Sequence, residues 1–160
     1  LQGGARPAGG WVVPLTVKFF PPGTANITTA TANYTFTQNT TKVDSTAVSQ
    51  VSGIIPGTYD ITAKSAHTLL NVKRDVVISQ FSTNVTVVTL LEGNAYESDT
   101  PNAGIINISD FTTMSATYGK SLGAPGYNAQ ADFDRNNIVN ISDFTLLSVN
   151  YQKTSPITVP

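Results

Sequence analysis

The chain has 160 residues, a formal net charge of −1 and only 12% charged residues, so it lacks the basic field that binds nucleic acid or anionic lipid. It contains no run of about 18 apolar residues and therefore predicts no membrane-spanning helix. Cysteine is absent and His67 is the only histidine, so the chain has few of the residues that zinc sites, redox sites and Ser–His–Asp triads require. We therefore expect a protein that is not an enzyme.

The first ninety or so residues alternate between apolar and polar positions, with turns between short segments. Leu15, Val17 and Phe19 alternate with polar residues, which is typical of a strand with one buried face. The predicted strands are residues 11–20, 34–37, 48–55, 58–64, 69–78 and 84–91. Short strands separated by frequent turns favour an all-β sandwich over residues 1–91.

One of these turns carries a recognisable pattern. The segment 53–61 reads Gly-Ile-Ile-Pro-Gly-Thr-Tyr-Asp-Ile and is similar to the turn-and-strand signature of prealbumin-like sandwiches, which include carboxypeptidase-regulatory-like domains. The resemblance implies a prealbumin-like β-sandwich that acts as a spacer, in the manner of an X-module. It also implies that Tyr59 and Ile61 pack inward. Carbohydrate binding by this sandwich is an alternative, although no strand face gathers aromatic residues.

The last third of the chain contains an internal repeat. Residues 106–112 read Ile-Asn-Ile-Ser-Asp-Phe-Thr, and residues 139–145 read Val-Asn-Ile-Ser-Asp-Phe-Thr. A repeat at a fixed offset indicates one structural unit that is used twice. Phe111 with Met114, and Phe144 with Leu147, have the spacing of a helical stripe. We therefore expect a helix after each copy of the motif, with Ser109 and Ser142 as N-caps.

The segment before the second copy has the spacing of a calcium-binding loop. Counted from Asp132, oxygen-bearing side chains fall at positions 1, 3, 5, 9 and 12, as in an EF-hand. Position 6 requires a positive φ angle, and Asn137 tolerates that conformation better than other non-glycine residues. The predicted calcium ligands are Asp132, Asp134, Asn136, the carbonyl of Ile138, Asn140 and Asp143.

Position 12 is Asp143, where a true EF-hand has glutamate. A duplicated loop–helix unit with aspartate at this position resembles the dockerin domains of bacterial cellulosome-type assemblies. The resemblance implies that residues 92–160 form a small all-α module with two calcium loop–helix repeats and one or two bound calcium ions. The expected fold is thus two domains, an N-terminal sandwich and a C-terminal dockerin-like module. Because millimolar calcium is an extracellular condition, we expect a secreted or cell-surface protein.

The first copy of the loop has two possible registers. A strict count places Asp99, Pro101 and Ala103 at positions 1, 3 and 5, so that only one side chain can act as a ligand. Alternatively, Asn94 is the first ligand and the loop carries five extra residues. The sequence leaves open whether this loop binds calcium. Its candidate ligands are Asn94, Asp99, Ile105, Asn107 and Asp110.

The resemblance also implies a surface for a cohesin-like partner. Carried over position by position, the contacts fall on matching residues of the two copies. In the first copy these are Ile108, Ser109, Ser115, Ala116 and Lys120, and in the second Ile141, Ser142, Ser148, Val149 and Lys153. This internal symmetry implies that a cohesin-like partner binds in two orientations.

The sequence therefore predicts a calcium-dependent docking module with an attached β-sandwich, within a larger secreted or cell-surface protein of a cellulosome-like assembly. Further domains of that larger protein would lie upstream of this chain. The main alternative is a calcium-stabilised structural tail, in which the module packs on the sandwich and no cohesin binds.

Overall fold

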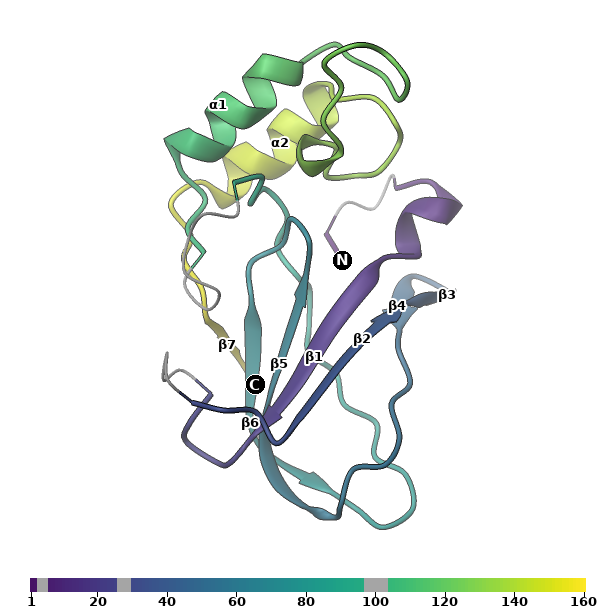
Figure 1. The fold of residues 1–160 in the computed structure, drawn as a ribbon, viewed down its shortest axis with the longest axis vertical. Helices are drawn as coiled ribbons and strands as arrows, with labels where there is room; N and C mark the ends of the chain where they lie inside the picture. The colour runs from purple at the N-terminus through teal and green to yellow at the C-terminus, as the bar shows by residue number, and fades with distance from the viewer. Residues whose placement is uncertain (3–5, 26–29, 97–103) are drawn as a thin grey trace.

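The chain folds around β5 (Gly57–Ser65), the central strand of a five-stranded sheet (Figure 1). The computed structural model describes residues 1–2, 6–25, 30–96 and 104–160. The strand order is β2-β1-β5-β6-β7, in which β6 and β7 are parallel and the other neighbours are antiparallel. The other strands of this sheet are β1 (Pro14–Phe20), β2 (Tyr34–Asn39), β6 (Asn71–Ile78) and β7 (Ile157–Val159). A separate hairpin consists of β3 (Thr41–Val43) and β4 (Thr46–Val48).

One face of the sheet buries the aromatic core. Phe19 on β1 meets Tyr59 on β5 edge-to-face, with ring centroids 5.9 Å apart. Ile61 lies in the same cluster, so the expected inward packing of Tyr59 and Ile61 is confirmed. Aromatic residues alternate with polar ones along these strands, and the alternation places every second side chain on the buried face.

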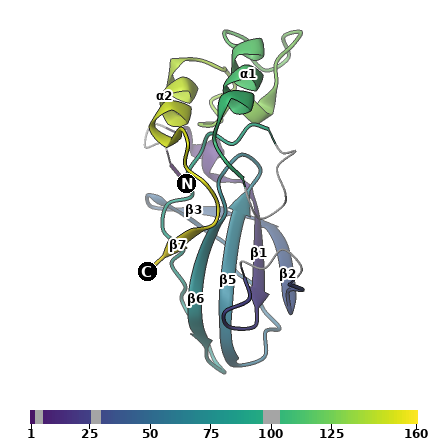
Figure 2. The ribbon, with the colours of Figure 1, turned by 90° about the vertical axis from the view of Figure 1, so that its left-hand side faces the viewer.

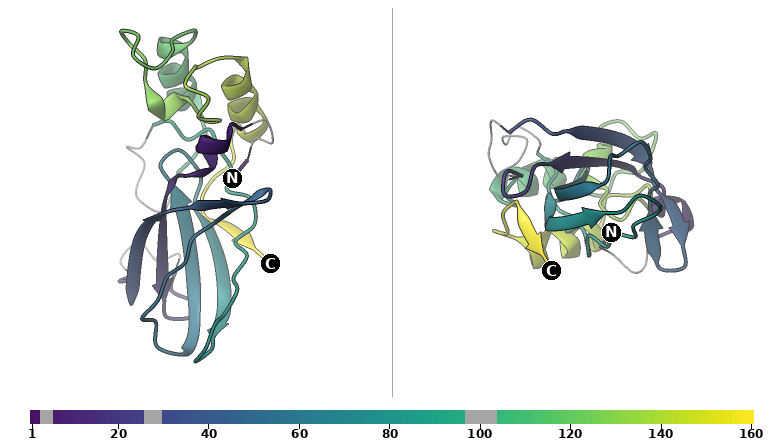
Figure 3. Two further views of the ribbon diagram at one scale, coloured as in Figure 1. Left: turned by 90° about the vertical axis from the view of Figure 1, so that its right-hand side faces the viewer. Right: turned by 90° about the horizontal axis from the view of Figure 1, so that it is seen from below.

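Two predicted strands are wrong. After β4, residues 49–56 run over the sheet as coil, and residues 79–91 likewise contain no strand (Figure 3). Their apolar side chains still cover the aromatic core, through Val51, Ile54 and Val85. Positive φ angles at Gly53 and Val88 interrupt the extended backbone that a strand requires. The apolar pattern of these two segments therefore predicted which side chains are buried, but it did not predict whether the backbone pairs as a strand.

Two short helices lie beyond one end of the sheet (Figure 2). They are α1 (Ile108–Thr117) and α2 (Ile141–Asn150), accompanied by the 3₁₀ turns η1 (Ala8–Trp11) and η2 (Ala129–Ala131). In the described ranges, neither α-helix has the length and apolar character needed to cross a bilayer.

The predicted N-caps are wrong by two residues. The side chains of Asn107 and Asn140 accept hydrogen bonds from the backbone N–H groups of Ser109 and Ser142, both at 2.7 Å. Three residues after each cap, an aspartate accepts a hydrogen bond from the backbone N–H of the cap residue, which completes a capping box. Asparagine is as good an N-cap as serine, and the aspartate three residues later favours it here.

The expected division into a sandwich and an all-α module is also wrong. The described residues form one β-rich unit, built on the five-stranded sheet and the two-stranded hairpin. The strand β7 follows α2 in the chain and pairs with β6, so residues from both expected domains build the same sheet. Leu69, beside β6, lies in the same hydrophobic core as Met114 and Leu147 of the helices.

The physical reason is that the helices pack into a core that also contains Leu69, next to β6. Two ten-residue helices bury too little apolar surface alone, so they share a core with the end of the sheet. The expected boundary between residues 91 and 92 falls inside this contact region, where the N–H of Leu69 donates to the carbonyl of Leu91 at 2.8 Å. Whether the segments on its two sides fold separately stays a prediction.

A buried ionic network holds this contact region together. Glu92 accepts a hydrogen bond from Nη2 of Arg6 at 2.7 Å and contacts Nδ1 of His67 at 2.8 Å. All three side chains are buried. The carbonyl of Glu92 also accepts a hydrogen bond from Nδ2 of Asn150, at the end of α2, at 2.7 Å. His67 lies in the turn after β5.

We expect Glu92→Gln to destabilise the protein by about 3 kcal/mol or more, because Arg6 would remain buried without its counter-charge. Asp44→Asn is the matched control, since it removes one negative charge from an exposed turn. Urea unfolding followed by circular dichroism measures both changes. Equal stabilities of the two variants would show that the network contributes little.

Candidate functional site

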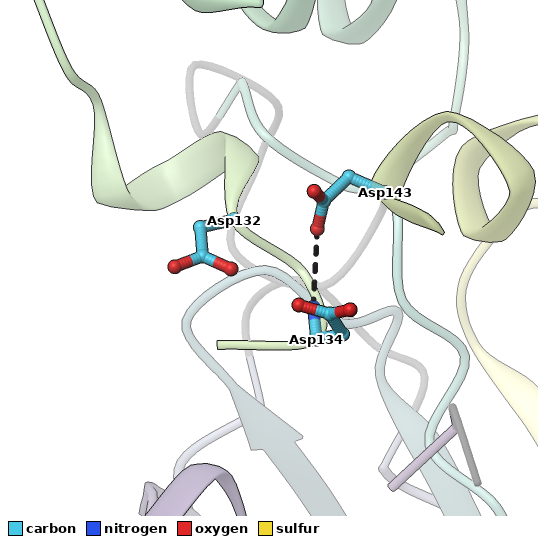
Figure 4. A group of neighbouring side chains, drawn as sticks. All are labelled: Asp132, Asp134 and Asp143. Atoms are coloured by element: carbon cyan, nitrogen blue, oxygen red, sulfur yellow. Dashed lines mark hydrogen bonds between the residues drawn. The ribbon is translucent and has the colours of Figure 1, made fainter. Parts of the chain in front are cut away.

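Three carboxylates converge where α2 begins. Oxygen atoms of Asp132, Asp134 and Asp143 all lie within 4.8 Å of one another, and all three residues are buried (Figure 4). Asp132 directly follows η2, and Asp143 is the third residue of α2. The backbone N–H groups of Phe133 and Asp134 donate to Oδ1 of Asp143 at 2.7 and 3.2 Å. These bonds hold the start of the loop against the start of the helix.

The intervening backbone curls around the carboxylates. The N–H of Asn136 donates to Oδ1 of Asp132 and of Asp134, at 3.1 and 3.0 Å. The N–H of Asn137 donates to Oδ2 of Asp132 at 2.9 Å. Asn137 has a φ angle of 70°, as its place at the sixth loop position predicted. The side chain of Asn140 caps α2 and also donates to the carbonyl oxygen of Ile138, at 3.2 Å.

The electrostatics of this cluster are unfavourable without a cation. The pKa of Asp143 is raised to about 6, chiefly by burial; backbone hydrogen bonds from Asn140 and Asp134 lower it, and the charges of Asp134 and Asp132 raise it. Burial also raises the pKa of Asp134. Carboxylate, amide and carbonyl oxygens are the ligands of hard cations such as calcium. The donor set therefore fits calcium.

The first loop repeats part of this arrangement. The N–H groups of Tyr96 and Asn107 donate to Asp110 at 2.9 and 2.7 Å, as those of Asp134 and Asn140 do to Asp143. This correspondence places Asn94 at the position of Asp132, and so supports the register with five extra residues. Asn94 is buried, and neither polar atom of its side chain has a hydrogen-bond partner. Asp99 lies outside the described residues, and Ile105 pairs with Thr154.

The two loop–helix copies pair reciprocally. The N–H of Gly119 donates to the carbonyl of Val139 at 2.8 Å, and Gln152, 33 residues later, donates to Ile106 at 2.7 Å. The bridges Ser121↔Ile138 and Ile105↔Thr154 show the same exchange. Each copy therefore completes the other, and the unit has an approximate internal two-fold symmetry.

The symmetry produces an exposed apolar surface on the two helices, which we call the helix face. Ile108 and Ile141 are 61% and 62% exposed, and the rings of Phe111 and Phe144 meet edge-to-face with centroids 6.3 Å apart. On this face lie two hollows of about 330 and 410 Å³. Equivalent residues line the hollows: Ile108, Phe111, Phe144, Leu147, Ser148 and Tyr151 in one, and Ile141, Phe144, Phe111, Met114, Ser115 and Tyr118 in the other.

The structure thus brings together only some of the predicted partner contacts. The isoleucines Ile108 and Ile141 and the serines Ser115 and Ser148 line the hollows. The remaining residues of that set, which do not line the hollows, are Ser109, Ala116, Lys120, Ser142, Val149 and Lys153.

Sequence reasoning missed four aromatic residues of the helix face. It placed Phe111 and Phe144 on a helical stripe without including them among the partner contacts and gave Tyr118 and Tyr151 no role, yet all four line the hollows. The signal was present in the repeat, because each aromatic residue recurs after 33 positions. Repetition alone could not show that these side chains remain exposed.

Comparison with known proteins identifies relatives of the fold only. No protein-family model and no curated protein matches the sequence. Two solved structures match with TM-scores of 0.58 and 0.57, each at 18% identity over 89% of this chain and 83% of theirs. They come from an N-terminal and a C-terminal interface mutant of a type II cohesin–X-dockerin complex of Acetivibrio cellulolyticus. The match spans most of the chain and shows the fold. The dockerin motif and the prealbumin-like signature stay predictions.

The raised pKa of Asp143 predicts a pH dependence of the calcium-free protein. An aspartate in the unfolded chain ionises near pH 4, whereas Asp143 in the folded state ionises near pH 6. The folded state therefore holds a proton that the unfolded state releases, so stability falls as the pH rises from about 4 to about 6. Above that window both states are ionised and the fall ends.

Urea unfolding in calcium-free buffer tests this, with Asp143→Asn as the reference that cannot ionise. Relative to the variant, the wild type should lose unfolding free energy between about pH 4 and pH 6. A difference that stays constant or grows in favour of the wild type would contradict the expected pKa.

Proposed function

We propose that this chain is a non-catalytic docking module that binds a cohesin-like domain through its helix face and requires calcium to hold that face in shape. The observation that carries the proposal is the pair of matching hollows on an exposed apolar face, beside a buried carboxylate cluster. An exposed surface of this kind marks an interaction site in a soluble protein.

Calcium has a direct physical role in this proposal. Asp132, Asp134 and Asp143 are buried together, and the charge of Asp132 raises the pKa of the other two although Arg6 and Arg135 lie near, so a bound cation would relieve their mutual repulsion. The second loop would bind it through the ligand set that its spacing predicts. In the first loop the ligands would be Asn94, Ile105, Asn107 and Asp110, with Asp99 outside the described residues. The ion would neutralise the carboxylates, and the loop residues bound to it would fix the first turns of α1 and α2.

The helix face has the composition of a binding surface. Aromatic residues dominate the energetically important centres of protein interfaces, and here Phe111 and Phe144 occupy the middle of the face. Lys120 and Lys153 are exposed. Two nearly equal hollows supply two nearly equal sets of contacts, in keeping with binding in two orientations.

The duplicated loop–helix unit favours the dockerin side of such a complex and a cohesin-like partner. The matched structures contain both kinds of component, and their likeness in fold does not distinguish them. A dockerin-like partner is therefore the alternative outcome of the binding test. Because calcium is abundant outside cells, we also propose that the protein is secreted or displayed on a cell surface.

One observation favours the alternative of a structural tail. The helices share a core with the sheet and are joined to it by the buried network around Glu92. If calcium folds the chain and neither component binds, this intramolecular packing is its role. Sugar binding lacks such support, because Phe19 and Tyr59, which a stacking platform would expose, are buried in the aromatic core.

We expect calorimetry to show calcium binding to the whole chain, with one or two ions bound. Asp143→Ala should weaken binding at the second loop by more than about tenfold, because it removes a ligand charge and a helix-start contact. Asp44→Asn, in an exposed turn, is the control and should bind as the wild type does. Absence of calcium binding to the wild type would refute the proposed site.

The docking role is tested with purified cohesin and dockerin domains, each with calcium and with chelator. The double variant Ile108→Asp/Ile141→Asp should bind the cohesin domain at least about 30-fold more weakly, since charges in both hollows block both orientations. Ile55→Asp is the matched control, because Ile55 is equally exposed but lies away from the helix face. Wild-type affinity of the double variant, or binding only to the dockerin domain, would overturn the assignment.

A further inference from the structure

The second loop has two sides, and only one of them faces the carboxylate cluster. Asp132 and Asp134 turn their carboxylates toward Asp143. The residues that alternate with them, Phe133 and Arg135, turn toward the sheet. The ring of Phe133 lies edge-to-face with His67, at a centroid distance of 5.7 Å. Nη2 of Arg135 donates to Oγ of Ser65, the last residue of β5, at 3.2 Å. The same four consecutive residues, 132–135, therefore contribute both to the candidate ion site and to the contact with the sheet.

The N-terminal 3₁₀ turn closes the other side of this contact. A Cβ atom on Gly10 would lie 2.9 Å from the carbonyl oxygen of Asp134 and 3.3 Å from Cβ of Arg135, so only glycine allows this approach. Arg6 holds the turn in place by donating from Nη1 to the carbonyl of Gly10 at 3.1 Å. The next residue, Trp11, is buried and is the only tryptophan in the chain.

The guanidinium of Arg135 is a sensitive part of this arrangement. Burial lowers its pKa, and Nε has no hydrogen-bond partner, so its contact with Ser65 is not backed by a dense network. The nearby charges are Glu92 and Asp132, which stabilise the cation, and Arg6, which opposes it. Arg135 also has a φ angle of 57°, in the left-handed region that few non-glycine residues adopt.

We propose that Arg135 is a positioning residue that couples calcium binding at the second loop to the junction between the sheet, the N-terminal turn and the helices. Calcium on the inner side fixes the loop backbone, and the fixed backbone holds Arg135 on Ser65 and Asp134 against Gly10. This inference rests on the proposed binding of calcium. Because coupling is reciprocal, the junction in turn raises calcium affinity. The ion then sets how the helix face is oriented on the sheet.

Trp11 provides the spectroscopic test in the whole chain. Calcium is titrated into chelator-treated protein, with tryptophan emission and calorimetry recorded in parallel. We expect the emission of Trp11 to change with the same midpoint as calcium binding. In Arg135→Ala, calcium should bind about tenfold more weakly and the emission change should lose most of its amplitude. Arg74→Ala is the matched control, since Arg74 on β6 pairs with Asp60 on β5.

A second variant tests the coupling if Arg135→Ala does not fold. Ser65→Ala removes only the acceptor hydroxyl and should reduce the emission change while calcium still binds. Calcium binding in the wild type without any change in Trp11 emission would overturn the coupling and leave the proposed function intact. A full emission change in both Arg135→Ala and Ser65→Ala would also overturn it. Absence of calcium binding would instead overturn the proposed function, and this inference with it.

Discussion

The carboxylate of Asp143 is the contact on which the second loop–helix unit depends. It accepts hydrogen bonds from the backbone N–H groups of Phe133, Asp134 and Asn140, and so joins the start of the loop to the start of α2. The same carboxylate lies buried beside Asp132 and Asp134. One side chain thus completes the capping box of α2, closes a loop and contributes charge to the carboxylate cluster. The burial that makes it a strong structural contact also raises its pKa.

The shared core gives this local arrangement consequences for the whole chain. Leu69 packs with helical residues, β7 returns from α2 to pair with β6, and Glu92 is bonded to residues from both ends of the sequence. A change at the second loop is therefore passed to the sheet through packed and hydrogen-bonded groups. The proposed role of Arg135 follows from the alternation of residues in the loop. Asp132 and Asp134 face the carboxylate cluster, whereas Phe133 and Arg135 contact the sheet side.

The internal symmetry explains why the helix face remains exposed. Reciprocal backbone bonds between the copies fix α1 and α2 side by side, and Met114 and Leu147 turn inward to the shared core. Phe111 and Phe144 are then left on the outside, at the centre of the pair. The two rings cover each other only in part, and their pairing makes the two hollows on this face equivalent.

The sequence by itself determined the local features: the repeat, the ligand spacing of the second loop, the positive φ angle of Asn137, the helix after each motif and the inward faces of β1 and β5. These features depend on residues close together in the chain. Their backbone preferences and periodicity can be recognised in the sequence without knowledge of the fold. Only the tertiary structure decided that the two expected domains are one unit, that residues 49–56 and 79–91 are coil, and that Phe111 and Phe144 are exposed. Burial and strand pairing depend on neighbours far away in sequence. Leu69, Glu92 and Arg135 acquire their roles only when segments far apart in the sequence meet between the sheet and the helices.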